Sequence, residues 1–356
     1  MTSPERIRVV VIDDSAFCRR VITDVLSSDP GIEVVGAGRD PYAARELIRA
    51  HAPDVLTLDL EMPGMDGLTF LRILMRDRPM PVVVVSSLTE RGAEATLSAM
   101  EAGAVDVVTK PKLDLARGLP ALSSELVAKV RAAASARVRA RGPRPAIERA
   151  AWRRPTIGRT TDRVIAIGGS TGGVEAIRVV LEGFPPDTPG VVVAQHMPAG
   201  FTRSWARRCD QVCAVRVKEA EDGDRLLEGH VLIAPGDHHL RLVRDGAHYR
   251  VTVTQDPLVN LHRPSVDVLF DSVARAAGPS AVGALLTGMG KDGARGLLAM
   301  RRAGASTIAQ DEATSVVFGM PREAIALGGA SEVRPLEAIA PGLLRLAASD
   351  VPAPSV

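Results

Sequence analysis

Acidic, hydroxyl and basic residues end successive apolar runs in the first third of the sequence. Asp13 and Asp14 follow the first run, Asp59 the third, Ser86 the fourth and Lys110 the fifth. Because the carboxyl ends of parallel strands meet at one edge of a sheet, these five side chains would share a pocket. A single aspartate there fits a strand-end cap equally well, but five suitable residues in this order favour a common site.

Three carboxylates in one pocket repel each other, and a hard divalent cation such as Mg²⁺ relieves that repulsion. An aspartate held beside such a cation can act as a nucleophile toward a phosphoryl donor. The hydroxyl of Ser86 and the ammonium group of Lys110 would then bind oxygens of the product. The sequence therefore predicts a phosphate-accepting site at Asp59 that uses Mg²⁺.

A second group of reactive residues begins at Gly168-Gly-Ser-Thr-Gly172, which has the G-x-S-x-G pattern after a strand-like run. In this setting a sharp turn presents the serine, Ser170, and the following helix offers N–H groups to developing negative charge. Taken alone, the motif fits a serine hydrolase and a nucleotide-binding or phosphate-binding turn equally well.

The next strand-like run, 191–194, favours the hydrolase, because a histidine follows where a dinucleotide site would need an acid. His196 is the expected general base, with His238 as the alternative, although a strand-end histidine is more often structural. Asp292, in a later glycine-rich loop, would orient the histidine, unless it caps the helix that follows. The N–H of Met289 is a candidate oxyanion donor.

Alternating strand and helix patterns place both groups of residues. The first part predicts five βα units and hence a parallel, doubly wound sheet. Its expected strands are 8–12, 33–37, 55–58, 81–85 and 105–108, and its expected helices are 16–27, 41–50, 68–76, 92–102 and 119–136.

The second part predicts another α/β domain with an antiparallel hairpin turning at Asp245-Gly246. Its expected strands are 164–167, 191–194, 231–234, 240–243, 249–253, 281–286 and 306–309, and its expected helices are 174–181, 265–277 and 294–303. A stretch rich in Arg, Ala and Pro at 136–161 separates the two parts and is typical of a linker. Its positive charge could contact an acidic partner, although a solvated spacer is the simpler interpretation.

The length and composition of the chain limit the functions that it could have. The 356 residues suffice for two domains, and 46% apolar and 24% charged residues are normal for a globular protein. A net charge of +2 and the absence of a basic recognition-helix pattern speak against nucleic-acid binding. No signal peptide and no apolar run long enough to enter a membrane are evident, and the 3 cysteines have no metal-site pattern. We therefore expect a cytoplasmic protein.

Residues 6–135 resemble the receiver domain of bacterial two-component response regulators. The motifs are Val11-Ile-Asp-Asp-Ser15, Leu58-Asp-Leu-Glu-Met-Pro63 with Met65-Asp-Gly67, Val85-Ser-Ser87 and Thr109-Lys-Pro111. The resemblance implies a flavodoxin-like fold with Asp59 as the phosphorylation site. It implies Asp13, Asp14 and the backbone carbonyl of Glu61 as further metal ligands, and Ser86 and Lys110 as the switch residues.

Residues 162–348 are similar to the chemotaxis protein-glutamate methylesterase family. The motifs are Gly168–Gly173, Gln195-His-Met-Pro198, Ala234-Pro-Gly236, Arg263-Pro-Ser-Val-Asp-Val268, Thr287–Gly293 and Gly319-Met-Pro-Arg322. The similarity implies a triad of Ser170, His196 and Asp292, with Thr171 and Met289 near the oxyanion site. Gly169 and Lys291 depart from the Ala and Asn that are frequent in the family.

The two resemblances together imply a function and its control. We expect hydrolysis of glutamate γ-methyl esters and deamidation of glutamines on methyl-accepting chemotaxis receptors, without a cofactor for the hydrolysis. A chemotaxis histidine kinase would phosphorylate the receiver, which would otherwise cover the active site. Two alternatives remain open: a nucleotide-binding effector, which NAD or ATP binding would reveal, and a non-catalytic adaptor, whose Ser170 would not react with an organophosphonate.

Overall fold

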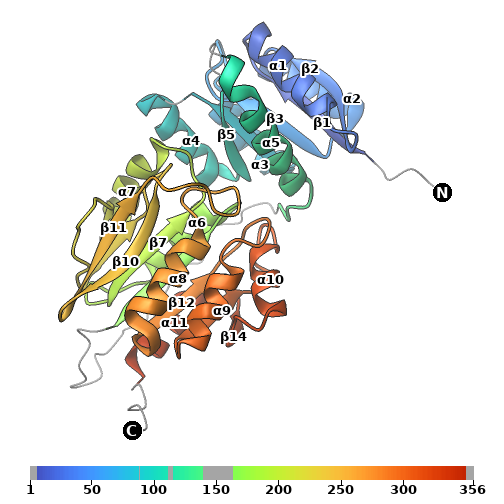
Figure 1. Cartoon of the computed structure of the whole chain (residues 1–356). Helices are drawn as coiled ribbons and strands as arrows, with labels where there is room; N and C mark the ends of the chain where they lie inside the picture. The colour runs from blue at the N-terminus through green and yellow to red at the C-terminus, as the bar shows by residue number, and fades with distance from the viewer. Residues whose placement is uncertain (1–5, 88, 111–114, 139–162, 350–356) are drawn as a thin grey trace. The chain divides into compact units, whose positions relative to one another are not determined.

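The computed structural model describes residues 6–87, 89–110, 115–138 and 163–349 (Figure 1). The chain divides into two compact units, Met1–Arg144 and Pro145–Val356. The division falls within the segment 136–161 that we interpret as a linker. Because residues 139–162 lie outside the described residues, the linker and the domain boundaries stay predictions.

The first unit is built on a parallel sheet of five strands in the order β2-β1-β3-β4-β5. This is the flavodoxin-like order, so the predicted fold is confirmed. The strands are β1 (Ile7–Ile12), β2 (Ile32–Gly38), β3 (Val55–Asp59), β4 (Val82–Ser86) and β5 (Asp106–Thr109), and the helices are α1 (Ala16–Ser27), α2 (Pro41–His51), α3 (Gly67–Asp77), α4 (Glu90–Ala102) and α5 (Leu115–Ala134).

Side-chain caps set where the helices of this unit begin. Ser15, Asp40, Asp66 and Thr89 each accept a hydrogen bond from the backbone N–H three residues further on. Such caps satisfy an N–H group that the helix itself leaves without a partner. The first of these helices therefore starts directly after the acidic pair that follows β1.

The second unit contains a parallel sheet of seven strands in the order β14-β13-β12-β6-β7-β9-β8 and a separate antiparallel hairpin, β10–β11. The predicted mostly parallel sheet and the hairpin are both confirmed. The strands are β6 (Val164–Gly169), β7 (Gly190–Gln195), β8 (Arg216–Glu219), β9 (His230–Ile233), β10 (His239–Asp245), β11 (His248–Thr254), β12 (Ala281–Leu285), β13 (Ser306–Gln310) and β14 (Glu332–Arg334).

Two groups of helices, α6 with α11 and α8 with α9 and α10, pack on the same central strands β6, β12 and β13. The helices are α6 (Gly173–Glu182), α7 (Phe201–Val212), α8 (Val266–Ala277), α9 (Ala294–Arg302), α10 (Met320–Ala326) and α11 (Ile339–Ala348). Sequence patterning did not predict α7, β8, α10, β14 or α11.

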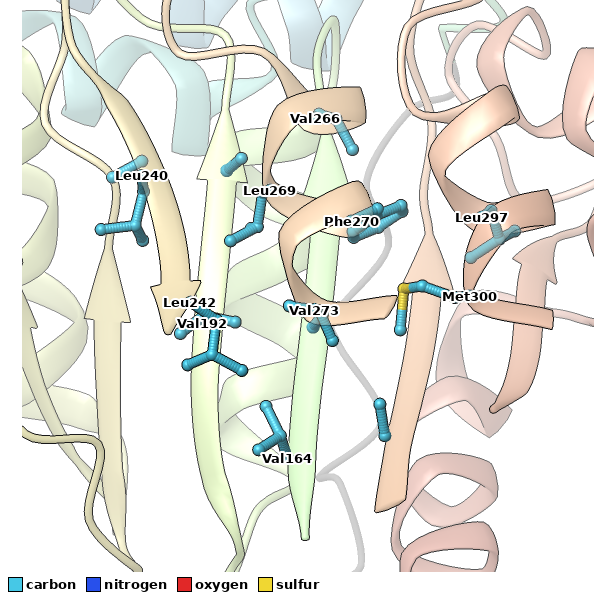
Figure 2. Close-up of a cluster of buried hydrophobic side chains, with 14 of the residues drawn as sticks. Val164, Val192, Leu240, Leu242, Val266, Leu269, Phe270, Val273, Leu297 and Met300 are labelled. Atoms are coloured by element: carbon cyan, nitrogen blue, oxygen red, sulfur yellow. The ribbon is translucent and has the colours of Figure 1, made fainter. Parts of the chain in front are cut away.

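A hydrophobic cluster joins the sheet to α8, α9 and the hairpin. In Figure 2, Leu269, Phe270 and Val273 of α8 face the strands that carry Val164 and Val192. All five side chains are fully buried. Burial of a side chain of this size typically contributes about 1.5–3 kcal/mol, so the cluster fixes α8 against the centre of the sheet.

Among the residues that the structure describes, no helix combines the length and the apolar character that crossing a bilayer requires. Among the described residues, Cys18, Cys209 and Cys213 form no disulfide bond.

Candidate functional site

Three adjacent strands of the second unit end at the residues predicted to do chemistry. Ser170 follows β6 and His196 follows β7, which pairs with β6 on one side. Asp292 lies in the loop after β12, which pairs with β6 on the other side. From β6 the chain continues to β7 on one side of β6, and it later forms β12 on the other side. The site therefore lies at the topological switch point, where open α/β sheets usually bind their ligands.

The structure brings Ser170, His196 and Asp292 into one hydrogen-bonded chain. The Nδ1 atom of His196 lies 3.0 Å from the Oγ of Ser170, and its Nε2 atom lies 2.8 Å from the Oδ2 of Asp292. The imidazole side chain is 7% exposed and the carboxylate 2% exposed. Both the ring of His196 and the carboxylate of Asp292 are thus shielded from water, which strengthens the electrostatic interaction between them.

Donors surround the carboxylate of Asp292, which is why it can stay ionised while buried. Besides His196, it accepts hydrogen bonds from Nδ2 of Asn260 at 2.6 Å, Oγ of Ser265 at 2.8 Å, and N of Val266 at 2.6 Å. Burial alone would raise its pKa, but the hydrogen bond and charge of His196, together with the other donors, hold the pKa of Asp292 well below its usual range.

Asp292 does not cap the helix that follows it, which was the alternative interpretation from the sequence. The cap position of α9 is Gly293, and no side chain caps that helix. The carboxylate instead binds the N-terminus of α8, where Ser265 is the cap residue. The positive end of a helix stabilises a nearby anion, so α8 supports the negative charge of Asp292.

Glycines around Ser170 make room for neighbouring elements. A Cβ atom on Gly168 would lie 2.2 Å from Val266, and one on Gly172 would lie 2.6 Å from Val316. Gly172 also has a φ of +77°, in the left-handed region that favours glycine. Ser170 itself is fixed by its N–H, which donates to the carbonyl of Thr287 at 3.0 Å.

Thr171 and Met289 are the predicted oxyanion residues. Thr171 follows Ser170 in the turn between β6 and α6, and Met289 lies in the loop after β12. Thr171 is buried, and its carbonyl accepts from the Oγ1 of Thr287 at 3.0 Å. The side chain of Met289 is 38% exposed. A Cβ on Gly288 would lie 2.8 Å from the Cβ of Ser170, so the loop that carries Met289 passes directly beside the serine.

His238, the alternative base, is not part of this chain of hydrogen bonds. Its Nδ1 lies 3.2 Å from the carbonyl of Gly236. Sequence reasoning also missed Asn260, which joins Asp292 to Asp267 through bonds of 2.6 and 2.8 Å. The signal for Asn260 was its place just before the Arg-Pro-Ser-Val-Asp motif, whose Ser265 and Asp267 belong to the same network.

The two departures from the family pattern leave the chain of hydrogen bonds in place. A Cβ on Gly169 would lie 3.0 Å from Oε1 of Gln195, so an alanine there would need a small shift of the glutamine. Lys291 is exposed, although it is next to the buried Asp292. Its charge is therefore at the rim of the site.

In the first unit, the predicted residues lie together at the carboxyl ends of the parallel strands. Ligand oxygens of Asp13, Asp14 and Asp59 lie within 4.8 Å of one another. Asp13 and Asp59 are fully buried. The Nζ of Lys110 donates to Oδ2 of Asp59 at 2.6 Å and lies 3.5 Å from Oδ2 of Asp13.

Burial makes this pocket costly for negative charge. It raises the pKa of Asp59 to about 6 despite the hydrogen bonds from Lys110 and the N–H of Glu61. It also raises the pKa of Asp13. The Oδ2 atom of Asp13 has no hydrogen-bond partner among the described residues. A buried carboxylate oxygen that has only the 3.5 Å ion-pair contact to Lys110, beside two further carboxylates, fits a hard divalent cation such as Mg²⁺.

Ser86 and Glu61 lie at the same edge. The Oγ of Ser86 is buried and donates to the carbonyl of Gly92, at the start of α4, at 3.2 Å. The side chain of Glu61 accepts from Oγ of Ser87 at 3.1 Å. The role of the Glu61 backbone carbonyl as a metal ligand stays a prediction.

Comparisons with known proteins agree with this description. Residues 9–117 match the model of the response regulator receiver domain, and residues 165–343 match that of the CheB methylesterase. The chain is 58% identical over 341 residues to a protein-glutamate methylesterase/protein-glutamine glutaminase of Bordetella parapertussis, covering 96% of this chain and 97% of the relative. A protein named protein-glutamate methylesterase/protein-glutamine glutaminase 2 from Pseudomonas aeruginosa is 55% identical, with the same coverage.

Among solved structures, the CheB methylesterase catalytic domain of Thermotoga maritima is 39% identical, with a TM-score of 0.51. It covers 52% of this chain, and 98% of that domain is matched. With one family model on each unit and relatives matched along nearly their whole length, the chain belongs to the protein-glutamate methylesterase/protein-glutamine glutaminase family of response regulators.

Proposed function

We propose that this chain hydrolyses glutamate γ-methyl esters and deamidates glutamines on methyl-accepting chemotaxis receptors, with Ser170 as the nucleophile. The observation that carries the proposal is the chain of hydrogen bonds from Ser170 through His196 to Asp292. Such a chain activates a serine for attack on an acyl carbon. The names of the relatives supply the substrate class.

In the first half of the reaction, the Oγ of Ser170 attacks the ester carbonyl while its proton moves to Nδ1 of His196. This step requires the neutral imidazole to carry its proton on Nε2, and the carboxylate of Asp292 favours that tautomer by accepting the Nε2–H. The ionised Asp292 then stabilises the imidazolium.

The tetrahedral intermediate carries its negative charge on the former carbonyl oxygen. We assign its stabilisation to backbone N–H groups near Thr171 and Met289, with help from the N-terminus of α6. That helix has no side-chain cap, so its first N–H groups can face the site. One oxyanion donor is typically worth about 3 kcal/mol of the barrier.

Collapse of the intermediate releases the methoxy group, which takes the proton from Nδ1 of His196 and leaves as methanol. Water then attacks the ester between Ser170 and the glutamyl group, giving its proton to the same Nδ1. The serine oxygen leaves with that proton, and glutamate is released. A glutamine follows the same course, with ammonia in place of methanol.

We further propose that phosphorylation of Asp59 by a chemotaxis histidine kinase raises this activity. Asp13, Asp14 and Asp59 would hold Mg²⁺, which supplies neutralisation of charge around the incoming phosphoryl group. Lys110 already contacts Asp59 and would bind a phosphoryl oxygen. Ser86 would turn from the carbonyl of Gly92 toward the new group, and this would move the start of α4.

Methanol release from methylated receptor membranes tests the hydrolysis. Ser170→Ala should reduce the release to the background of a sample without enzyme. Continued release from that variant would disprove the role of Ser170. Inactivation of the wild type by a fluorophosphonate, with the label on Ser170, would separate the enzyme from an inert adaptor.

Acetyl phosphate with Mg²⁺ tests the control by the receiver. We expect it to raise methanol release from the wild type and to leave Asp59→Ala unchanged. Stimulation retained in Asp59→Ala would show that the phosphate acts elsewhere.

A further inference from the structure

A second histidine lies flat on the proposed general base. The ring centroids of His262 and His196 are 3.6 Å apart, and the two ring planes differ by 16°. Both nitrogen atoms of His196 point in its ring plane toward Ser170 and Asp292. His262 therefore covers one face of the imidazole without competing for either hydrogen bond.

The segment that presents His262 adopts an unfavourable backbone conformation. Asn260 and Leu261 have φ values of +52° and +68°, in the left-handed region, although neither is glycine. Non-glycine residues in this region persist only where their surroundings hold them. Strain of this kind gathers at functional sites, and here it immediately precedes the stacked ring.

Contacts on both sides of His262 hold this conformation. Nδ2 of Asn260 donates to both Asp292 and Asp267, and the backbones of Val259 and His262 exchange hydrogen bonds of 2.9 and 3.1 Å. On the other side, the guanidinium group of Arg263 donates to Asp237 and to the carbonyls of residues 255 and 256. The ring of His262 is thus placed by the same network that holds the acid of the triad.

A stacked neutral ring affects the two protonation states of His196 differently. When His196 takes the proton of Ser170 it becomes a cation, and the π face of a neutral ring attracts a cation in a site shielded from water. A proton on His262 would reverse this effect, because two stacked cations repel. A neutral His262 therefore favours the state of His196 that forms in the transition state.

Other charged groups near His196 and His262 contribute to the electrostatic potential at the two rings. Asp292 contacts Nε2 of His196, and Asp267 lies behind it through Asn260. Arg295 lies 3.5 Å from both Asp267 and Asn260, and Lys291 is exposed at the rim. These groups belong to the loop after β12, to α8 and to α9, and they are unchanged by substitution at His262.

We propose that His262 is a positioning residue that fixes the ring of His196 and stabilises its cationic form during catalysis. The proposal rests on the proposed function of Ser170. It predicts that an aromatic ring at position 262 matters more than the ring's nitrogen atoms. Phenylalanine should therefore replace His262 better than alanine does.

The test is the rate at which a fluorophosphonate inactivates the full-length protein between pH 5 and 9. The Oγ of Ser170 displaces fluoride from phosphorus in this reaction, and the serine proton passes to His196. For His262→Ala we expect inactivation to be about tenfold slower at pH 7.5, with the acid limb of the profile moved to lower pH. His262→Phe should react within about threefold of the wild type.

Three controls separate the possible outcomes. His248→Ala removes an exposed imidazole from β11 and should leave the profile unchanged. Thermal unfolding checks that each variant is folded, and His262→Phe keeps the test valid if the alanine variant unfolds. If the wild type is not labelled, or Ser170→Ala is labelled equally, the proposed function fails. If the wild type is labelled but His262→Ala keeps its rate and profile, or His262→Phe is no faster than His262→Ala, only the role of His262 is overturned.

Discussion

Replacing Asp292 with asparagine tests the geometry of the triad most directly. The amide nitrogen of the new side chain must take the place of one carboxylate oxygen. At the Oδ2 position it faces Nε2 of His196 and the N–H of Val266. At the Oδ1 position it faces Nδ2 of Asn260, Oγ of Ser265 and the N–H of Asp267.

The number of donors left without an acceptor decides between the two orientations. At Oδ1 the hydroxyl of Ser265 can rotate to accept, but Asn260 and Asp267 each keep a donor without a partner. At Oδ2 the ring of His196 can change tautomer and accept on Nε2, so only the N–H of Val266 is left. One buried donor without an acceptor costs about 1–3 kcal/mol, so the Oδ2 orientation is favoured.

That orientation disables the base, because Nδ1 of His196 then carries the proton and cannot accept the one from Ser170. The negative charge that would stabilise the imidazolium is also lost. In other Ser-His-Asp enzymes the same substitution lowers turnover by about 10⁴. We expect a loss of about 10³–10⁴ in kcat for Asp292→Asn, with a free energy of unfolding lower by about 1–3 kcal/mol.

Methanol release from methylated receptor, together with urea unfolding, measures both effects. Asp267→Asn is the matched control, because Asp267 is also buried and bonded to Asn260 and to the N–H of Gly296. It should lose similar stability but less than about tenfold in kcat, since no hydrogen bond to His196 changes. A kcat of Asp292→Asn within about tenfold of the wild type, in a folded protein, would refute the reasoning.

Three further predictions concern the serine turn, the receiver pocket and the rim. At Gly172 φ is +77°, and an added Cβ would lie 2.6 Å from Val316. Gly246 is the control, because its φ is +59° but an added Cβ would meet nothing within 4 Å. The urea midpoint of Gly172→Ala should therefore fall more than that of Gly246→Ala. Because the pKa of Asp59 is raised to about 6, protons compete with Mg²⁺ below that pH. Calorimetry should therefore show Mg²⁺ affinity about tenfold weaker at pH 5 than at pH 7, and a smaller dependence in Asp59→Asn, where Asp13 keeps its raised pKa. Lys291→Asn removes an exposed positive charge from the rim, so KM for an acidic receptor segment should rise about two- to threefold at low salt, with kcat unchanged.

The sequence predicted the central strands of both sheets because buried parallel strands are nearly continuous apolar runs rich in Val, Ile and Leu. The run that ends at Asp59 is an example, with every residue of β3 buried. The helix α7 was missed because most of its residues are polar, although Phe201, Trp205 and Cys209 form a buried stripe four residues apart. The strand β14 has 3 residues, too few for an alternating pattern to emerge.

The positions of the three residues that we propose as reactive could be predicted from the sequence, but the groups that hold them could not. Ser170, His196 and Asp292 each follow a strand, so their meeting point follows from sheet topology alone. Asn260 and His262 reach the site through a segment whose left-handed backbone conformation is not predicted by any local sequence pattern. The orientation of His196, with Nδ1 toward the serine, also depends on tertiary packing.

One buried aspartate lies at the centre of each site, and the two differ in how their surroundings treat a negative charge. Asp59 accepts hydrogen bonds from Lys110 and from the N–H of Glu61, and burial outweighs them, so its pKa rises to about 6. Asp292 is also buried, but donors from His196, Asn260 and the start of α8 outweigh burial and lower its pKa. A carboxylate that is costly to keep charged has the most to gain from a cation and a phosphoryl group. A carboxylate that is saturated with donors stays ionised and rigid, as the orientation of a catalytic histidine requires.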